Sequence, residues 1–144
     1  MAAGIQIVFD ATDPARLAEF WIEALGYVLQ PVPEGFESWD DWARAMGIPE
    51  ERWNDARAIV DPEGQSPRVF IQRVPEGKTA KNRMHLDLDA SGGPARPIED
   101  RRRAVDAEVE RLAGLGAAIV GPVSQRDEYW VVLQDPEGNE FCVH

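Results

Sequence analysis

The sequence is poor in the residues that most often form covalent links or bind metals. Its 144 residues include one cysteine, Cys142, so no intrachain disulfide can form. The two histidines are His85 and His144. No Ser/His/Asp set, phosphate-binding glycine loop or zinc-ligand spacing is present. These absences exclude the familiar triad hydrolase, P-loop and zinc-finger classes.

Basic residues are also scarce. The chain has 15 lysines and arginines against 26 acidic residues, a formal net charge of -11. A protein of this charge repels phosphate backbones and anionic membrane surfaces, so we expect no nucleic-acid or membrane partner. No apolar run approaches the about 20 residues that span a bilayer. The first four residues lack the basic character of a signal peptide, and we expect a cytoplasmic protein.

An internal repeat is the most informative feature. The tetrapeptide Asp-Pro-Glu-Gly occurs at 61–64 and again at 135–138. Segments 5–11 and 84–90 share one pattern, and each precedes a Pro-Ala-Arg and a later Leu-Gly. Four landmarks in the same order indicate a duplicated module. We expect a single domain, 1–144, made of modules near 1–79 and 80–144.

Each module is predicted to have the order β-α-β-β-β, which makes the fold class α+β. In the first helix Asp13 is the expected N-cap, Pro14 suits the first turn, and Gly26 ends the helix. A second helix is expected at 99–115. The expected strands are 5–10, 27–32, 56–60 and 68–74, then 84–89, 117–120, 129–134 and 140–143. The first module also carries an insertion at 35–53.

Two segments carry a family resemblance. They are Asp-Pro-Ala-Arg-Leu-Ala-Glu-Phe-Trp at 13–21, before Leu-Gly-Tyr at 25–27, and Asp-Pro-Glu-Gly-Asn-Glu-Phe at 135–141. The chain resembles the vicinal oxygen chelate superfamily of glyoxalase and bleomycin-resistance-like proteins, and is most similar to its glyoxalase-like domain branch. The resemblance implies two tandem βαβββ modules whose curled mixed sheets surround a shared cavity. It also implies a small-molecule ligand and a homodimer.

Period-2 alternation predicts which strand residues face away from the helices. Gln6 and His85 occupy equivalent positions on the mixed faces of the two first strands. Phe70 and Gln72 share a face of the last strand of module one. Three residues share a face of the last strand of module two: Glu140, Cys142 and His144. Trp130 and Val132 also share a face, which parity alone does not assign.

The resemblance implies metal-ligand positions at Gln6, Gln72, His85 and Cys142, with Glu140 as the alternative if the register shifts by one pleat. Only His85 is a typical imidazole ligand, because amide oxygens bind divalent metals weakly. We therefore expect no tightly bound catalytic metal and leave the cofactor unknown, with a divalent metal as the alternative. His144, the last residue, is expected to fray. Cys142 is expected to be a small buried residue rather than a nucleophile.

The insertion is rich in aromatic residues. The pattern from Trp39 through Trp42 to Met46 predicts a short amphipathic helix, with Ser38 as its N-cap. Its rings, with Trp53, either anchor the insertion to the sheet edge or cap the cavity. In the second case, at least one of the three tryptophans faces the ligand.

Two functions follow. The first is a binding protein that holds an organic ligand in the cavity, where Asp87 and Asp89 would suit a cation. The alternative is a glyoxalase-like lyase or isomerase that uses a metal, or His85 as general base, the best catalytic candidate. The candidate ligand-binding residues are Gln6, Trp39, Trp42, Phe70, Gln72, His85, Asp87, Trp130 and Cys142.

Overall fold

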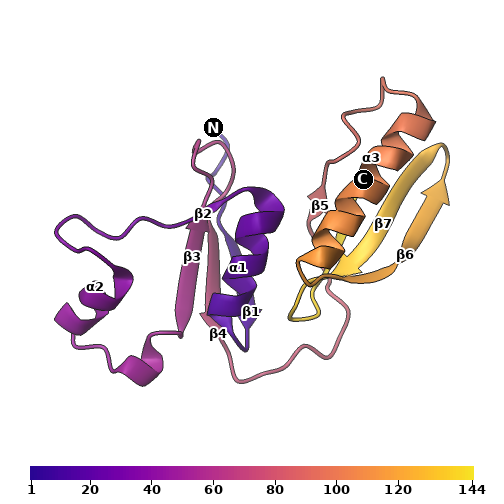
Figure 1. Cartoon of the computed structure of the whole chain (residues 1–144). Coiled ribbons are helices and arrows are strands. Elements are labelled where there is room, and N and C mark those ends of the chain that lie inside the picture. Colours follow the sequence, from indigo (N-terminus) through magenta and orange to yellow (C-terminus); the bar gives the residue numbers. More distant parts are fainter. The chain divides into compact units, whose positions relative to one another are not determined.

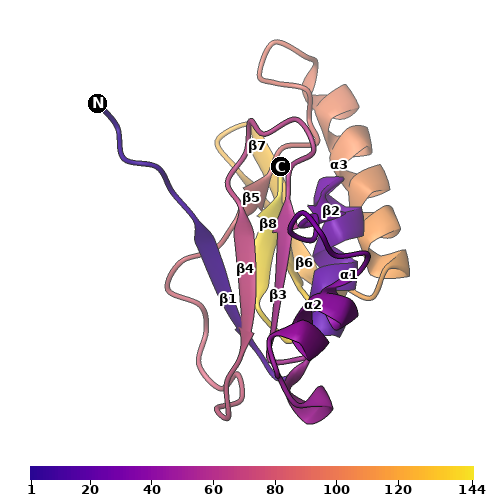
Figure 2. The same ribbon diagram turned by 90° about the vertical axis from the view of Figure 1, so that its left-hand side faces the viewer.

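A computed structural model describes all residues from Met1 to His144, in two compact units, Met1–Gly77 and Lys78–His144 (Figure 1). We call these units the first and the second module. Each contains one four-stranded mixed sheet with one long helix against one of its faces (Figure 2). No helix of the structure has the length and hydropathy needed to cross a membrane.

The elements follow the predicted order in both modules. The first module contains β1 (Ile7–Ala11), α1 (Pro14–Leu25), β2 (Val28–Leu29), α2 (Trp39–Ala45), the 3-10 turn η1 (Glu50–Arg52), β3 (Ala56–Val60) and β4 (Val69–Arg73). The second contains β5 (Asp87–Leu88), α3 (Ile98–Gly114), β6 (Ala118–Gln125), β7 (Glu128–Gln134) and β8 (Glu140–Val143). The insertion accounts for α2 and η1, which have no counterpart in the second module.

Both sheets have the same topology. The strand orders are β1-β4-β3-β2 and β5-β8-β7-β6. In each sheet the first strand pairs in parallel with the last, and the other pairs are antiparallel. The predicted α+β class with two tandem βαβββ modules is therefore confirmed.

Helix α1 begins and ends at the residues that the sequence marks. The Asp13 carboxylate accepts the backbone N–H of Arg16 at 3.3 Å, and Gly26 closes the helix with a left-handed φ of 69°. A further contact, which no sequence pattern predicts, comes from Asn54, whose side chain accepts the N–H of Ala15 and donates to Asp13. These contacts, led by the Asn54 bond, lower the pKa of Asp13.

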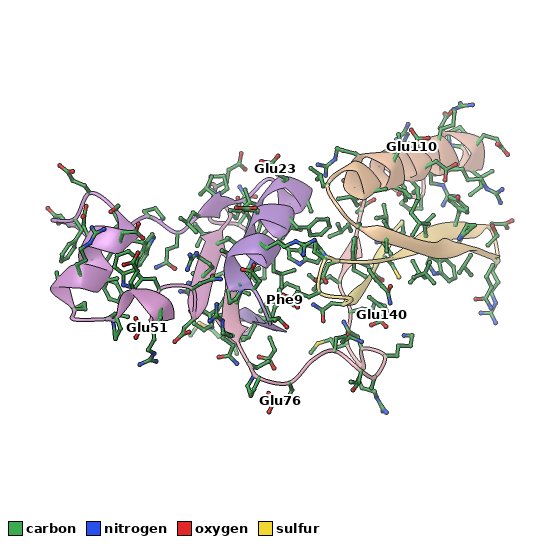
Figure 3. The ribbon with its side chains drawn as sticks, turned by 60° about the horizontal axis from the view of Figure 1, so that its bottom comes forward. Phe9, Glu23, Glu51, Glu76, Glu110 and Glu140 are labelled. Carbon is green, nitrogen blue, oxygen red and sulfur yellow. The ribbon has the colours of Figure 1, made fainter.

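The core of each module lies between its helix and one face of its sheet. In the first module the buried stripe of α1 includes Leu17 and Trp21, and Phe9 on β1 stacks on Trp21 at 5.3 Å (Figure 3). In the second module Leu112 of α3 is buried, as are the alternate sheet residues Val131, Leu133, Phe141 and Val143. The apolar faces thus pack on the helices, as alternation predicts.

The two Asp-Pro-Glu-Gly segments form the same turn. In each, the glycine N–H donates to the carbonyl of the aspartate, at 3.0 Å for Gly64 and 2.9 Å for Gly138. Both glycines have positive φ, 68° and 85°, which glycine adopts without strain. Asp61 and Asp135 each accept backbone N–H groups from the residues that follow. Each turn joins the third strand of its module to the fourth.

Three strands depart most from their predicted lengths. β2 is shorter than 27–32 because Pro31 has no N–H to continue the ladder after Gln30. β5 is shorter than 84–89 because it pairs only with the four-residue β8. β6 runs beyond residue 120 because Arg126 and Asp127, both with positive φ, form a two-residue hairpin to β7.

The C-terminal residue also differs from expectation. The backbone N–H of His144 donates to Leu88, and its carbonyl accepts N–H groups of Ala90 and Ser91. These hydrogen bonds join the backbone of His144 to β5 and to the residues that follow it, so the last residue is paired in the structure.

Candidate donor cluster of the second module

The face of each sheet turned away from its helix, here called the helix-free face, carries the polar candidates. In the first module the register pairs Val8 with Phe70 and Asp10 with Gln72. In the second module it pairs Asp87 with Cys142. The same face also holds Trp130, because Val132 pairs with Cys142 and residue 130 lies one pleat further along β7. The structure thus assigns the face that parity left open.

Strand register identifies which positions of the two modules correspond. Ile59 and Leu133 each lie two residues before the turn aspartate of their module. Ile59 pairs with Val69, and Leu133 pairs with Phe141. Phe70 is therefore the counterpart of Cys142. By the same register, Gln72 corresponds to His144, Arg68 to Glu140 and Gln6 to His85.

The offset arises in the turns. The Asp61 carboxylate accepts N–H groups from Gln65 and Ser66 as well as Glu63, so the first turn is longer before β4 begins. In the second module Asn139 directly precedes β8, and its N–H donates to Asp135 at 3.0 Å. Sequence motifs alone therefore aligned Gln72 with Cys142, whereas the backbone aligns Phe70 with it.

Three potential donors meet on the helix-free face of the second module. His85 Nδ1 lies 3.0 Å from Asp87 Oδ1. One ligand atom each from His85, Asp87 and Cys142 lies within 4.8 Å of the others. The His85 and Asp87 side chains are 41% and 52% exposed, whereas Cys142 is 9% exposed. We call this set the donor cluster.

The environment of Cys142 keeps its thiol protonated. Burial raises the pKa of this thiol, and the neighbouring Asp87 carboxylate raises it further by charge and hydrogen bonding. A thiolate is the nucleophilic form, so the free protein holds Cys142 as a hydrogen-bond donor rather than as an attacking group. Binding of a metal would have to displace that proton.

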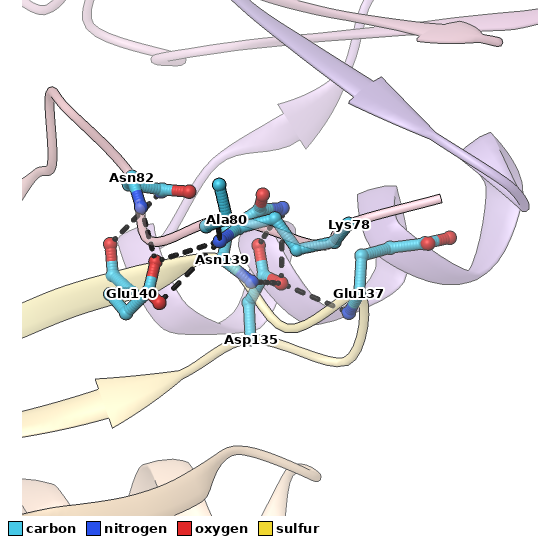
Figure 4. Close-up of polar contacts among 7 residues, drawn as sticks. All are labelled: Lys78, Ala80, Asn82, Asp135, Glu137, Asn139 and Glu140. Carbon is cyan, nitrogen blue, oxygen red and sulfur yellow. Dashed lines mark hydrogen bonds and ion pairs between the residues drawn. The ribbon is translucent and has the colours of Figure 1, made fainter. Parts of the chain in front are cut away.

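Glu140, the alternative ligand, is committed elsewhere. Its carboxylate accepts the N–H of Asn82 at 2.9 Å and pairs with Lys78 at 3.1 Å (Figure 4). Lys78 also donates to the carbonyl of Ala80. These contacts, led by the Asn82 N–H, lower the pKa of Glu140 to about 2. The residue therefore fastens the segment before β5 to β8.

The family ligand positions of the first module are also occupied by contacts within the chain. Gln6 Oε1 accepts a hydrogen bond from Arg68 Nη1 at 2.6 Å. Gln72 Nε2 donates to Asp10 at 2.8 Å, and Phe70 offers no donor. A guanidinium beside Gln6 opposes a second cation there. Gln6 and Gln72 are thus engaged by side chains of their own module, whereas the donor cluster offers one nitrogen, one oxygen and one sulfur.

The tryptophans of the insertion make anchoring contacts. Ser38 caps α2 as predicted. Trp39 Nε1 donates to the Gln30 carbonyl at 2.8 Å, and Trp53 Nε1 donates to the Ile48 carbonyl at 2.9 Å. Trp42 packs edge-on against Trp39, with ring centroids 5.4 Å apart. All three tryptophans are half-buried, and Trp39 joins the insertion to Gln30, the residue directly after β2.

Sequence reasoning missed four polar residues of these faces: Gln30, Arg68, Lys78 and Asn82. A signal existed for Arg68, since it has the same parity as Phe70 and Gln72. None existed for Asn82 or Lys78, because they lie in a segment without periodicity.

Tandem βαβββ modules of this topology are shared with several solved proteins. The fold matches a fosfomycin resistance protein from Listeria monocytogenes, solved with Mn(II) and a dihydroxypropylphosphonic acid, with a TM-score of 0.62 and 12% identity over 100% of this chain and 90% of that one. It matches a possible glyoxalase from Bacillus cereus with a TM-score of 0.62 and 14% identity, covering 99% and 98%.

A third similar structure is the bleomycin-binding protein of Streptomyces verticillus, in complex with copper(II)-bleomycin. Its TM-score is 0.54 at 16% identity, covering 99% of this chain and 95% of that one. A comparison with curated proteins finds no match. The glyoxalase-like domain family matches residues 6–144. The chain therefore belongs to the glyoxalase-like domain family.

Proposed function

We propose that this protein binds a small organic ligand on the helix-free face of its second module, with the donor cluster as the polar centre. The supporting observation is the meeting of His85, Asp87 and Cys142 within 4.8 Å on the face that also carries Trp130. Binding sites of this kind combine an apolar surface with a few convergent polar groups. Trp130 supplies the flat apolar surface, and the cluster supplies the polar groups.

The charge of this face suits a ligand with a cationic or hydrogen-donating group. Asp87 is half exposed, and Asp89 follows directly after β5. The imidazole of His85 can donate or accept, depending on its tautomer. A similar structure holds copper(II)-bleomycin, which supports a large organic ligand as one class to test here.

The test is a ligand titration followed by tryptophan emission, with copper-free bleomycin as the first probe. We expect saturable binding that Trp130→Ala weakens by about 1–3 kcal/mol, the scale of an aromatic anchor. Trp53→Ala is the matched control, because the Trp53 N–H is bonded inside the insertion. If Trp130→Ala binds bleomycin as tightly as the parent protein does, the ligand does not bind at this face of the second module.

A second candidate function is a metal-assisted lyase or isomerase. The observation that favours it is the nitrogen, oxygen and sulfur donor set of the cluster, which fits a borderline metal such as Zn²⁺. A metal bound there would act as a Lewis acid toward a ligand oxygen. The chain itself would supply His85 and Asp87 to hold it, and the thiolate of Cys142 once its proton is released.

Calorimetric titration with zinc chloride separates the two functions. We expect a metal-binding cluster to give one equivalent of tight binding that His85→Ala abolishes. The control is His144→Ala, which removes the other imidazole from the same face. If His85→Ala binds zinc as the parent does, the cluster is not a metal site and the ligand-binding function stands alone.

A further inference from the structure

The helix-free face of the first module carries a cation without a counter-charge. Arg68 lies immediately before β4, and its backbone carbonyl accepts the N–H of Ile7 at 3.0 Å, which fixes it beside β1. Its Nε donates to Gln30 Oε1 and its Nη1 to Gln6 Oε1, each at 2.6 Å. None of the ion pairs in the structure includes Arg68.

Neutral partners make this arrangement unusual for a protein with a net charge of -11. Acidic side chains outnumber basic ones, yet the two groups that hold Arg68 are amides. Amide oxygens orient the guanidinium without neutralising it. They take two of its five N–H groups, so three remain, two of them on Nη2. That number is enough for a two-point contact with an oxyanion.

The contacts of Gln30 keep the guanidinium in place. The Gln30 N–H donates to Ala58 at 2.8 Å, and its carbonyl accepts the Trp39 indole N–H at 2.8 Å. Both bonds fix the backbone of Gln30, while its side chain is left to orient Arg68. The insertion therefore helps to position the cation.

An apolar surface adjoins the cation. The Arg68 guanidinium carbon lies 5.4 Å from the centre of the Phe70 ring. Phe70 pairs across the strands with Val8 on one side and Ala58 on the other. A ligand whose anionic group contacts Arg68 would place its body on this row of apolar side chains.

We propose that Arg68, oriented by Gln6 and Gln30 beside Phe70, binds the carboxylate or a similar oxyanion of an organic ligand that carries an aromatic or aliphatic body. The site lies in the first module and shares no residue with the donor cluster. The inference rests on the proposed function only in that both concern a small organic molecule.

Calorimetric titration with benzoate, acetate and benzamide tests the proposal. Benzoate has both the anion and the ring, acetate has only the anion, and benzamide has only the ring. We expect benzoate to bind the parent protein most tightly. Because hydrogen bonds between two charged groups are stronger than those between neutral groups, Arg68→Gln should weaken benzoate binding by about tenfold or more. Arg68→Lys should retain part of the affinity.

Arg73→Gln is the matched control. It removes the same charge from the end of β4. Residue 73 has the parity of the helix-facing residues Val69 and Ile71, and its guanidinium pairs with Asp55 at 3.8 Å. Its affinity for benzoate should stay within about twofold of the parent value, since a remote exposed charge acts weakly through solvent.

A second variant covers the case in which loss of Arg68 disturbs the fold. Gln6→Glu places a carboxylate on Arg68 and should abolish benzoate binding while the midpoint of thermal unfolding is unchanged or higher. Unchanged benzoate affinity in Arg68→Gln or Gln6→Glu, or no saturable benzoate binding by the parent, would overturn the inference. Probe binding at the donor cluster is a separate measurement, so either proposal can fail alone.

Discussion

The two modules have the same strand order, yet equivalent positions carry opposite charges. Arg68 stands before β4 in the first module and Glu140 opens β8 at the same register in the second. The side-chain amides of Gln6 and Gln30 orient Arg68. Glu140 instead accepts the N–H of Asn82 and forms an ion pair with Lys78. A duplicated backbone thus presents a cation on one helix-free face and a set of acidic and soft donors on the other.

The comparison shows where duplication constrains the sequence and where it does not. The turn aspartates, the helix ends and the apolar face that packs on the helix are alike in both modules, because each sheet must bury one face. The helix-free faces are not needed for that burial. They differ in almost every polar residue, and the candidate sites are found there.

The largest expected effect concerns the separate cores. Leu17 on α1 and Leu112 on α3 are both fully buried, so Leu17→Ala and Leu112→Ala should each lower the free energy of unfolding by about 2–5 kcal/mol. Because each module has its own core, we expect native-state hydrogen exchange to increase mainly in the module that carries the substitution. Leu115→Ala, at a leucine that is 37% exposed, is the control. Equal increases in both modules would contradict the separation.

The next effect compares the two turns. Asp135 is buried and accepts N–H groups from the Glu137 and Asn139 backbones and from the Asn139 amide. Asp135→Ala leaves these donors without their acceptor and should lower the free energy of unfolding by about 1–3 kcal/mol. Asp61→Ala removes an equivalent acceptor from a turn open to water, so its effect should be smaller. Chemical denaturation measures both, and a larger loss for Asp61→Ala would reverse the order.

The third prediction concerns how the stability of the fold depends on pH through Glu140. The pKa of Glu140 is lowered from 4.5 to about 2, so its ionised form stabilises the fold above 4.5 and this contribution is lost as the pH falls toward 2. Glu140→Gln should flatten the dependence of unfolding free energy on pH in that window. Glu110→Gln, an exposed residue on α3, is the charge-matched control. An unchanged slope in Glu140→Gln would show that the carboxylate is not held in solution.

The smallest expected effect concerns the insertion, which only the first module has. Trp39→Phe keeps an aromatic ring against Trp42 but removes the hydrogen bond to the Gln30 carbonyl. We expect a loss of about 0.5–1.5 kcal/mol in unfolding free energy, the value of one hydrogen bond. Trp53→Phe removes a bond within the insertion and should cost a similar amount without changing benzoate binding. If Trp53→Phe weakens benzoate binding as much as Trp39→Phe does, the hydrogen bond from Trp39 to Gln30 has no particular role in positioning Arg68.

The fold could be predicted from sequence because its signals are local and repeated. Asp13, Pro14 and Gly26 mark one helix, and the two Asp-Pro-Glu-Gly turns mark the same strand connection twice. The residue at which β4 begins could not be predicted. It depends on how many backbone N–H groups of the turn donate to the Asp61 carboxylate. The three members of the donor cluster, His85, Asp87 and Cys142, were all candidates from the sequence. These residues come together because β5 pairs in parallel with β8, and no local sequence pattern predicts that pairing.

The exposed edge of the second sheet bears on how the protein behaves at high concentration. β6 is an edge strand of eight residues on which Ile119 and Val120 are 53% and 61% exposed. Such a strand offers a template for another chain and is a common start of aggregation. Here the register shifts between Ile119 and Gly121, and Pro122 lacks an N–H. A bulge and a proline in the middle of the strand leave no long flat ladder for a neighbour to extend, which protects the protein from edge-to-edge assembly despite its apolar side chains.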